Sequence, residues 1–159
     1  MTTSSGTSKI QSTRSLLKLR LLSERAVYTP GKGKFPVCPI CNDPVMYGGD
    51  MHEALITKGM VRGNKDADKI NSRQNCVIRH NECPDGQRHN PGVGSEWDFI
   101  SCLKQIVWFE TYGAVIIWLN QMKEYFPVVA DQVLQRVMFA EVEGYLSDKE
   151  TRQNEKTRS

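Results

Sequence analysis

Hydrophobic residues recur at helical spacing in two long stretches of the C-terminal half of the chain. Between Glu96 and Met122 apolar positions lie three or four residues apart, which predicts one long helix with a weak centre at Gly113. Pro127 is suited to the first turn of a second helix, which we expect to run to about Leu146. The buried stripe of this second helix is predicted to be Val128, Val129, Val133, Leu134, Val137 and Met138.

The N-terminal third shows weaker patterns. Residues 1–13 are small and polar without periodicity, which predicts a flexible tail. Residues 14–27 mix leucines with lysines and arginines and predict a basic helix, which either contacts phosphates or packs with its charged face in solvent. Two prolines and two glycines in residues 28–36 predict a loop.

Short extended segments are expected in the middle of the chain. Residues 37–46 and 50–56 are predicted to form a hairpin around a turn at 47–49. Residues 58–73 are polar and charged and predict a surface excursion, after which residues 75–78 form another extended piece. The chain is thus divided into a tail (1–13), a basic helix and linker (14–36), a central core (37–94), C-terminal helices (95–146) and a charged tail (147–159).

Composition narrows the class of protein. The chain has 159 residues, of which 39% are hydrophobic and 25% charged, so we expect one small globular domain. No apolar stretch reaches the roughly 20 residues that a membrane span needs, and no secretory signal is visible, so no membrane partner is expected. A balance of 21 Lys and Arg against 18 Asp and Glu gives +3, which permits a polyanionic partner without requiring one.

Cysteine and histidine are concentrated in one region. The chain has five cysteines, an odd number, and shows no export signal. Both observations favour metal binding over disulfides. Cys38 and Cys41, and again His80 and Cys83, are separated by two residues, and the two pairs together supply four ligands for a tetrahedral Zn²⁺. Such a zinc would be structural and would replace core that a small domain lacks. Cys76 is a competing ligand that we expect to pack as a small apolar residue.

A second group of metal-binding residues has no part in this zinc site. Asp50, His52 and Glu53 lie on one limb of the excursion between the two pairs, and His89 lies beyond the second pair. These side chains could share an open site that holds a divalent cation and leaves positions for water and phosphate oxygens.

The order of these motifs resembles that of the zinc-bearing HNH endonucleases. It comprises a Cys-x-x-Cys pair, an acidic and histidine cluster, Asn75, a second zinc pair and a late histidine, over residues 37 to 92. The resemblance implies an α+β fold with a zinc-stabilised ββα-metal core, flanked by an N-terminal helix and a C-terminal helical hairpin. It further implies hydrolysis of phosphodiester bonds in DNA with one catalytic Mg²⁺ or Mn²⁺, in the cytoplasm of a bacterial or phage-infected cell. Asn75 would hold the loop so that the general base is correctly oriented.

The chain departs from the family pattern at two points, and the roles of the residues depend on them. The family has two adjacent residues, a metal ligand and then the base, whereas here His52 is followed by Glu53. If the two adjacent residues are matched to this family pattern without a shift, His52 is the ligand and Glu53 the base. The shifted assignment, which we prefer because glutamate is a weak base, makes Asp50 the ligand and His52 the base. Pro84 stands where the family often has its last metal histidine, so His89 would have to supply that ligand.

Basic residues near this core are candidates for contacts with DNA phosphates, and acidic neighbours predict that the affinity is modest and salt-sensitive. The C-terminal helices would pack on the core, or support a homodimer or a protein partner. Two other functions are open: a non-catalytic zinc module that binds nucleic acid or protein, and a redox dithiol at Cys38 and Cys41, against which the second ligand pair argues. The candidate phosphate contacts are Lys34, Arg73, Arg79 and Arg88.

Overall fold

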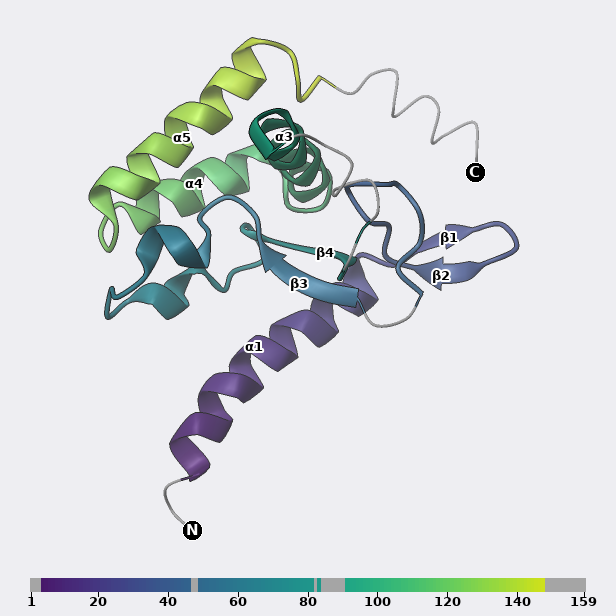
Figure 1. The fold of residues 1–159 in the computed structure, drawn as a ribbon, viewed down its shortest axis with the longest axis horizontal. Helices are drawn as coiled ribbons and strands as arrows, with labels where there is room; N and C mark the ends of the chain where they lie inside the picture. The colour runs from purple at the N-terminus through teal and green to yellow at the C-terminus, as the bar shows by residue number, and fades with distance from the viewer. Residues whose placement is uncertain (1–3, 47–48, 82, 84–90, 148–159) are drawn as a thin grey trace.

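The computed structural model describes residues 4–46, 49–81, 83 and 91–147, with the backbone alone for 4–12 and 91–95. The fold is mixed α and β, with two small antiparallel sheets and helices at both ends (Figure 1). This confirms the α+β class.

A two-stranded hairpin lies at the centre of the molecule. Strand β3 (Gly49–Glu53) pairs antiparallel with β4 (Cys76–His80), and Met51 lies opposite Ile78. The predicted hairpin of residues 37–46 with 50–56 is therefore wrong, because β3 takes its partner from beyond the excursion. Residues 37–46 contribute only an isolated bridge between Val37 and Pro44.

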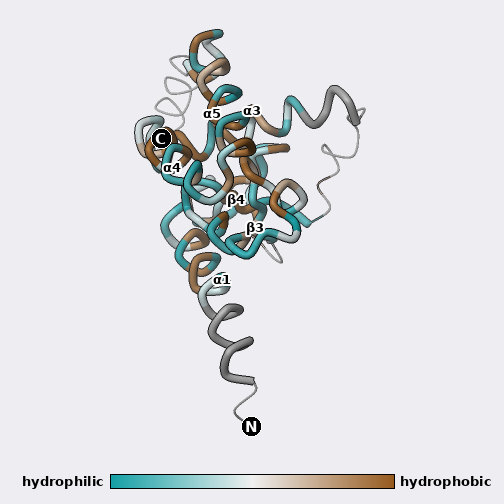
Figure 2. The backbone as a smooth tube through the Cα atoms, turned by 90° about the vertical axis from the view of Figure 1, so that its left-hand side faces the viewer, coloured by the Kyte–Doolittle hydropathy of each residue, from teal (hydrophilic) through white to brown (hydrophobic). Residues whose placement is uncertain are grey.

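The two faces of this hairpin pack against different parts of the chain. Successive side chains of a strand point to opposite faces, and directly opposed residues share a face. Met51 and Ile78 thus share one face, where they form a buried cluster with Leu21 of α1 (Ser4–Glu24) and the zinc-pair cysteines. Val77 faces the other way and joins the larger cluster built by the C-terminal helices, in which Figure 2 shows hydrophobic stretches of β4 and α3.

Two predictions for the N-terminal region need correction. Helix α1 begins at Ser4, so the predicted tail of residues 1–13 is helical from that point, and α1 extends away from the body of the molecule (Figure 1). The predicted loop at 28–36 contains a second hairpin, β1 (Val27–Thr29) with β2 (Gly33–Phe35). Strands of three residues are too short to show an alternating pattern.

The excursion between β3 and β4 is anchored to the core. It contains two 3-10 helices, η1 (Lys58–Val61) and η2 (Ala67–Ile70), and the side chains of Val61 and Ile70 are buried. The polar composition of residues 58–73 correctly indicates exposure of most of the segment but conceals these two anchors.

The predicted long helix is two helices with a sharp bend. Helix α3 (Pro91–Glu110) is separated by Thr111 from α4 (Tyr112–Met122), and the pair is bent by 108°. Thr111 has a positive φ of 77°, and its hydroxyl accepts a hydrogen bond from the Ala114 amide, which caps α4. The hydrophobic period continues on both sides of the break, so periodicity alone does not reveal it.

Helix α5 (Pro127–Val142) begins at the predicted proline and ends before the predicted Leu146. Of the predicted stripe, Val133, Leu134 and Val137 are confirmed as buried and Val129 is partly buried, whereas Val128 is 67% and Met138 42% exposed. The buried residues of α5 are Ala130, Val133, Leu134, Val137 and Ala140.

Among the described residues, no single helix is long and apolar enough to cross a bilayer. Helices α3 and α4 together have that length and apolar character, but only as a bent pair.

Two glycines should respond in opposite ways to substitution by alanine. A Cβ at Gly49 would lie 2.4 Å from Val45 Cγ1, so Gly49→Ala should lower the free energy of unfolding by about 1–3 kcal/mol. Gly113 lies in α4 with no heavy atom within 4 Å of an added Cβ, so Gly113→Ala should raise it by about 0.5–1 kcal/mol. Urea denaturation of both variants measures these changes, and equal effects would contradict the close packing at Gly49.

Candidate functional site

The two predicted zinc pairs lie together at one end of the central hairpin. One ligand atom from each of Cys38, Cys41, His80 and Cys83 lies within 4.8 Å of the others. The sulfurs of Cys38 and Cys83 are 3.9 Å apart, and Cys41 Sγ is 3.4 Å from His80 Nδ1. Tetrahedral Zn²⁺ with bonds of about 2.3 Å to sulfur and 2.0–2.1 Å to nitrogen places ligand atoms about 3.5–3.8 Å apart. The four residues could therefore hold a structural zinc.

The first pair lies in a tight turn that the backbone itself closes. The Asn42 amide donates to the Cys38 carbonyl at 2.8 Å, and the Cys38 amide donates to the Asp43 carbonyl at 2.9 Å. Asn42 has a φ of 64°, a left-handed conformation that asparagine tolerates better than most residues. This turn brings both sulfurs to the same side of the loop.

His80 is oriented by a contact outside the ligand set. Its Nε2 lies 3.1 Å from the Pro44 carbonyl oxygen, while its Nδ1 faces the sulfur of Cys41. A ring that donates through Nε2–H to a carbonyl presents an unprotonated Nδ1, which is the form that binds a metal. The second contact of the imidazole thus favours metal ligation.

The cluster argues against a redox dithiol, because Cys38 and Cys41 share it with His80 and Cys83, which dithiol exchange does not need. Burial raises the pKa of the Cys41 thiol to about 12. Cys76 is fully buried in the cluster beside α1, and burial raises its pKa to about 12 as well. The prediction that Cys76 packs as an apolar residue is confirmed.

Asn75 holds the polypeptide that follows β3. Its side chain is completely buried, and its Oδ1 accepts hydrogen bonds from the amides of Leu55 at 3.0 Å and Ile56 at 2.8 Å. Its Nδ2 donates to the carbonyls of Ile56 and Ile70, at 2.8 and 2.9 Å. One side chain therefore fixes the exit of β3 and the end of η2 to the start of β4.

Asp50 and His52 project from the face of β3 opposite the zinc cysteines. The His52 Nε2 lies 3.5 Å from Asp50 Oδ2, and Arg79 pairs with Asp50 across the hairpin. Burial, followed by the charge of Arg79, lowers the pKa of His52, so the imidazole is neutral near pH 7. Within the described chain, His52 Nε2 and Arg79 Nε are buried polar atoms without a hydrogen bond. This face thus combines a carboxylate, a neutral imidazole and a guanidinium.

Glu53 lies on the other face and is already paired. The Arg14 guanidinium of α1 lies 3.2 Å from Glu53 Oε1 and also donates to the Met51 carbonyl at 3.0 Å. The side chain of Glu53 is only 8% exposed. Glu53 therefore fastens α1 to β3.

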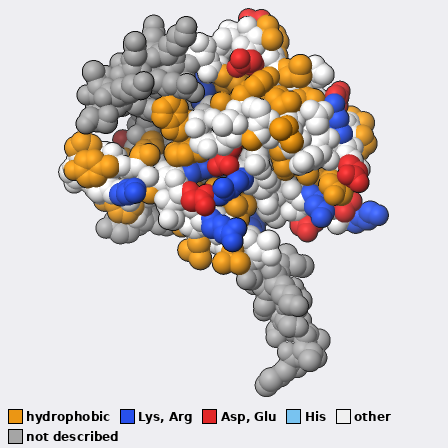
Figure 3. Space-filling model, turned by 180° about the vertical axis from the view of Figure 1, so that it is seen from behind, with side chains coloured by type: hydrophobic (Ala, Val, Ile, Leu, Met, Phe, Trp, Pro, Cys, Tyr) orange, Lys and Arg blue, Asp and Glu red, His pale blue; other side chains and the backbone are white. Residues whose placement is uncertain are grey.

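The remaining predicted residues are dispersed. Lys34 is exposed on β2, whereas Arg73 forms ion pairs with Glu24 and with Glu110, so part of its charge is offset. His89 and Arg88 lie outside the described residues. The back of the molecule shows positive and negative side chains interspersed, without a uniformly basic face (Figure 3).

The sequence interpretation missed a buried arginine beside Asn75. Arg25 is 2% exposed and donates to the Arg73 carbonyl at 2.7 Å and to the Cys76 carbonyl, on either side of Asn75. Its Nη2 also lies 3.3 Å from a Glu110 carboxylate oxygen. An arginine within a basic helical segment gives no sequence signal that distinguishes this role from solvent exposure.

The comparisons with known proteins add no family: no family model, curated protein or solved structure matches the chain.

Proposed function

We propose that this protein is a metal-dependent DNA endonuclease of the HNH type, in which a structural zinc stabilises the hairpin that carries the catalytic groups. The observation that carries the proposal is the placement of Asp50 beside His52, at 3.5 Å, on the hairpin face away from the zinc ligands. The fixing of the β3 exit by Asn75 supports it, because the resemblance assigns that positioning role to this asparagine.

The chemistry of the two side chains suits hydrolysis of a phosphodiester. A neutral imidazole accepts a proton from water near neutral pH, and a carboxylate oxygen is a preferred ligand of Mg²⁺. In this proposal His52 is the general base and Asp50 the ligand of the divalent cation. The cation, when bound, supplies stabilisation of the negative charge that develops on the phosphate. Arg79, from the paired strand, adds a further positive charge on the same face.

The alternative assignment, with His52 as ligand and Glu53 as base, is less compatible with the contacts. Glu53 points to the opposite face of β3 from His52, because adjacent strand residues alternate. It is also engaged by Arg14. We therefore propose that Glu53 has a structural role. The substrate and main partner of the protein is, in this proposal, DNA.

Nicking of a supercoiled plasmid tests the proposal. The wild-type protein should convert supercoiled DNA to open-circular or linear DNA when Mg²⁺ or Mn²⁺ is added. His52→Ala should reduce the rate by at least about a hundredfold, because it removes the proton acceptor. Its zinc content should stay unchanged, since His52 is outside the zinc set.

Two further variants make the assay decisive. Asp68→Asn changes an exposed carboxylate on η2 and should cleave like the wild type. If a folded Glu53→Gln protein loses as much activity as His52→Ala while Asp50→Asn does not, the assignment of the base to His52 is wrong. A zinc-loaded wild-type protein that cleaves no DNA with any divalent metal would instead favour the non-catalytic zinc module.

A further inference from the structure

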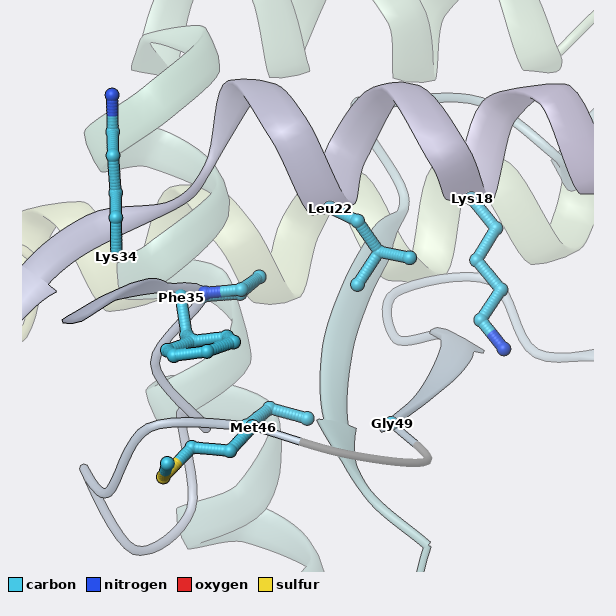
Figure 4. Close-up of a pocket in the computed structure, with 8 residues that line it drawn as sticks. Lys18, Leu22, Lys34, Phe35, Met46 and Gly49 are labelled. Carbon is cyan, nitrogen blue, oxygen red and sulfur yellow. The ribbon is translucent and has the colours of Figure 1, made fainter. Parts of the chain in front are cut away.

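A groove of about 330 Å³ opens between α1 and the loop that follows the Cys38/Cys41 turn. Its apolar wall includes Leu22 from α1, Phe35 from β2 and Met46 from the loop (Figure 4). Its volume is at the lower end of the range of ligand-binding clefts, about 300–1,000 Å³. Neither Asp50 nor His52 lines it.

Two lysines flank this apolar wall. Lys18 comes from α1 and points toward the side of the groove on which Gly49 lies, whereas Lys34 comes from β2 and its side chain points away from the groove (Figure 4). No acidic side chain lines the groove among the described residues. Two separated cations suit a chain of anionic groups better than one small anion, because a chain can reach both.

Aromatic side chains accompany these cations on the β1–β2 hairpin. Tyr28 is 72% exposed and pairs in register with Lys34, so the two share one face of the hairpin. Phe35, the next residue of β2, faces the groove, so Tyr28 and Lys34 lie on the opposite face of the hairpin. Lysines beside accessible rings are the combination by which proteins bind single-stranded nucleic acid, because unpaired bases stack on rings while phosphates contact the cations.

We propose that this groove binds single-stranded DNA, with an unpaired base against Phe35, a phosphate on Lys18, and the strand continuing over the edge of the β1–β2 hairpin to Lys34 and Tyr28 on its other face. The inference rests on the proposed function for its choice of nucleic acid over other polyanions, and it specifies that function further: the substrate includes an unpaired segment. Duplex DNA does not offer the face of a base to such a groove, since its bases are stacked on one another.

Fluorescence anisotropy with a labelled oligothymidylate of about 12 nucleotides tests this binding. Ca²⁺ replaces Mg²⁺ so that binding is measured apart from cleavage. The double variant Lys18→Ala/Lys34→Ala should weaken binding at least about tenfold, whereas Lys58→Ala, which removes an exposed lysine of η1, should change it less than about twofold. Binding of a duplex of the same length should change less than that of the single strand.

Phe35 variants separate stacking from simple apolar contact. Phe35→Leu should weaken oligothymidylate binding about five- to tenfold, and Phe35→Tyr should retain it, because only the latter keeps an aromatic ring. Zinc content and circular dichroism verify that each variant is folded.

The inference is overturned if the lysine variants weaken binding of single-stranded and duplex DNA equally, or if Phe35→Leu leaves oligothymidylate binding unchanged. It is also overturned if poly-glutamate competes with the protein's binding of oligothymidylate as well as unlabelled oligothymidylate does, which would indicate an acidic protein partner. The failure of the proposed function is distinguishable. A protein that binds oligothymidylate through these residues but never cleaves a plasmid has lost only the nuclease assignment, and one that cleaves while the groove variants bind normally has lost only the groove.

Discussion

Cys38→Ser should abolish tight zinc binding and release the central hairpin from its packed state. The substitution removes one of the four ligands, and the apparent free energy of zinc binding in small zinc domains is about 10–16 kcal/mol. Amide hydrogen exchange in β3 and β4 should accelerate at least about a thousandfold, equivalent to about 4 kcal/mol. Helices α3 to α5 should be less affected, because their hydrophobic cluster contains none of the zinc ligands.

Cys102→Ala is the matched control for this experiment. Cys102 is also a buried cysteine, but it lies in the cluster of the C-terminal helices and outside the zinc set. The variant should keep one zinc per chain, as measured by metal analysis with mass spectrometry. Its free energy of unfolding should fall by only about 1 kcal/mol. Stoichiometric zinc and unchanged hydrogen exchange in Cys38→Ser would contradict the assignment of the four ligands.

Asn75→Ala should lower the free energy of unfolding by about 3–5 kcal/mol while zinc remains bound. The substitution leaves the buried amides of Leu55 and Ile56 without their acceptor, and each buried unsatisfied group costs about 1–3 kcal/mol. The carbonyls of Ile56 and Ile70 lose a donor as well. Urea denaturation measures the loss, and plasmid nicking should fall with it because β3 is no longer fixed beyond Glu53.

Asn120→Ala provides the comparison for Asn75. Asn120 is exposed on α4 and donates a single side-chain hydrogen bond, to the Ile116 carbonyl, so its loss should change stability by less than about 0.5 kcal/mol. If the two variants have the same stability, the buried hydrogen bonds of Asn75 do not support the fold as we describe.

The grouping of the four residues that could hold zinc was predictable from the sequence, because each pair is defined by a short spacing along the chain. Two residues between ligands suffice to bring both members of a pair to one ion, whatever the rest of the chain does. The pairing of β3 with β4 was less accessible, since the partners are separated by the excursion with η1 and η2. The proposed choice between His52 and Glu53 rests on which face of β3 is buried, and the sequence does not indicate that Met51 lies in the core.

The helices show the complementary difficulty. The start of α5 at Pro127 was predictable because proline suits the first turn of a helix. The break at Thr111 was not, because a positive φ at a single residue changes the direction of the chain without interrupting its hydrophobic period. The centre of the buried face of α5, with Val133, Leu134 and Val137, was predictable, whereas the exposure of Val128 and Met138 depends on how α4 packs against α5.

The strict alternation of side chains along β3 has a consequence for how this region tolerates changes in length. Deleting one residue within β3 would exchange the two faces for part of the strand, so that Met51 would join the face of Asp50 or His52 would enter the hydrophobic layer beside Leu21. Insertions among exposed residues 62–65 would leave that parity intact. Natural or engineered variants should therefore differ freely in the length of the excursion, while the length of β3 stays constant.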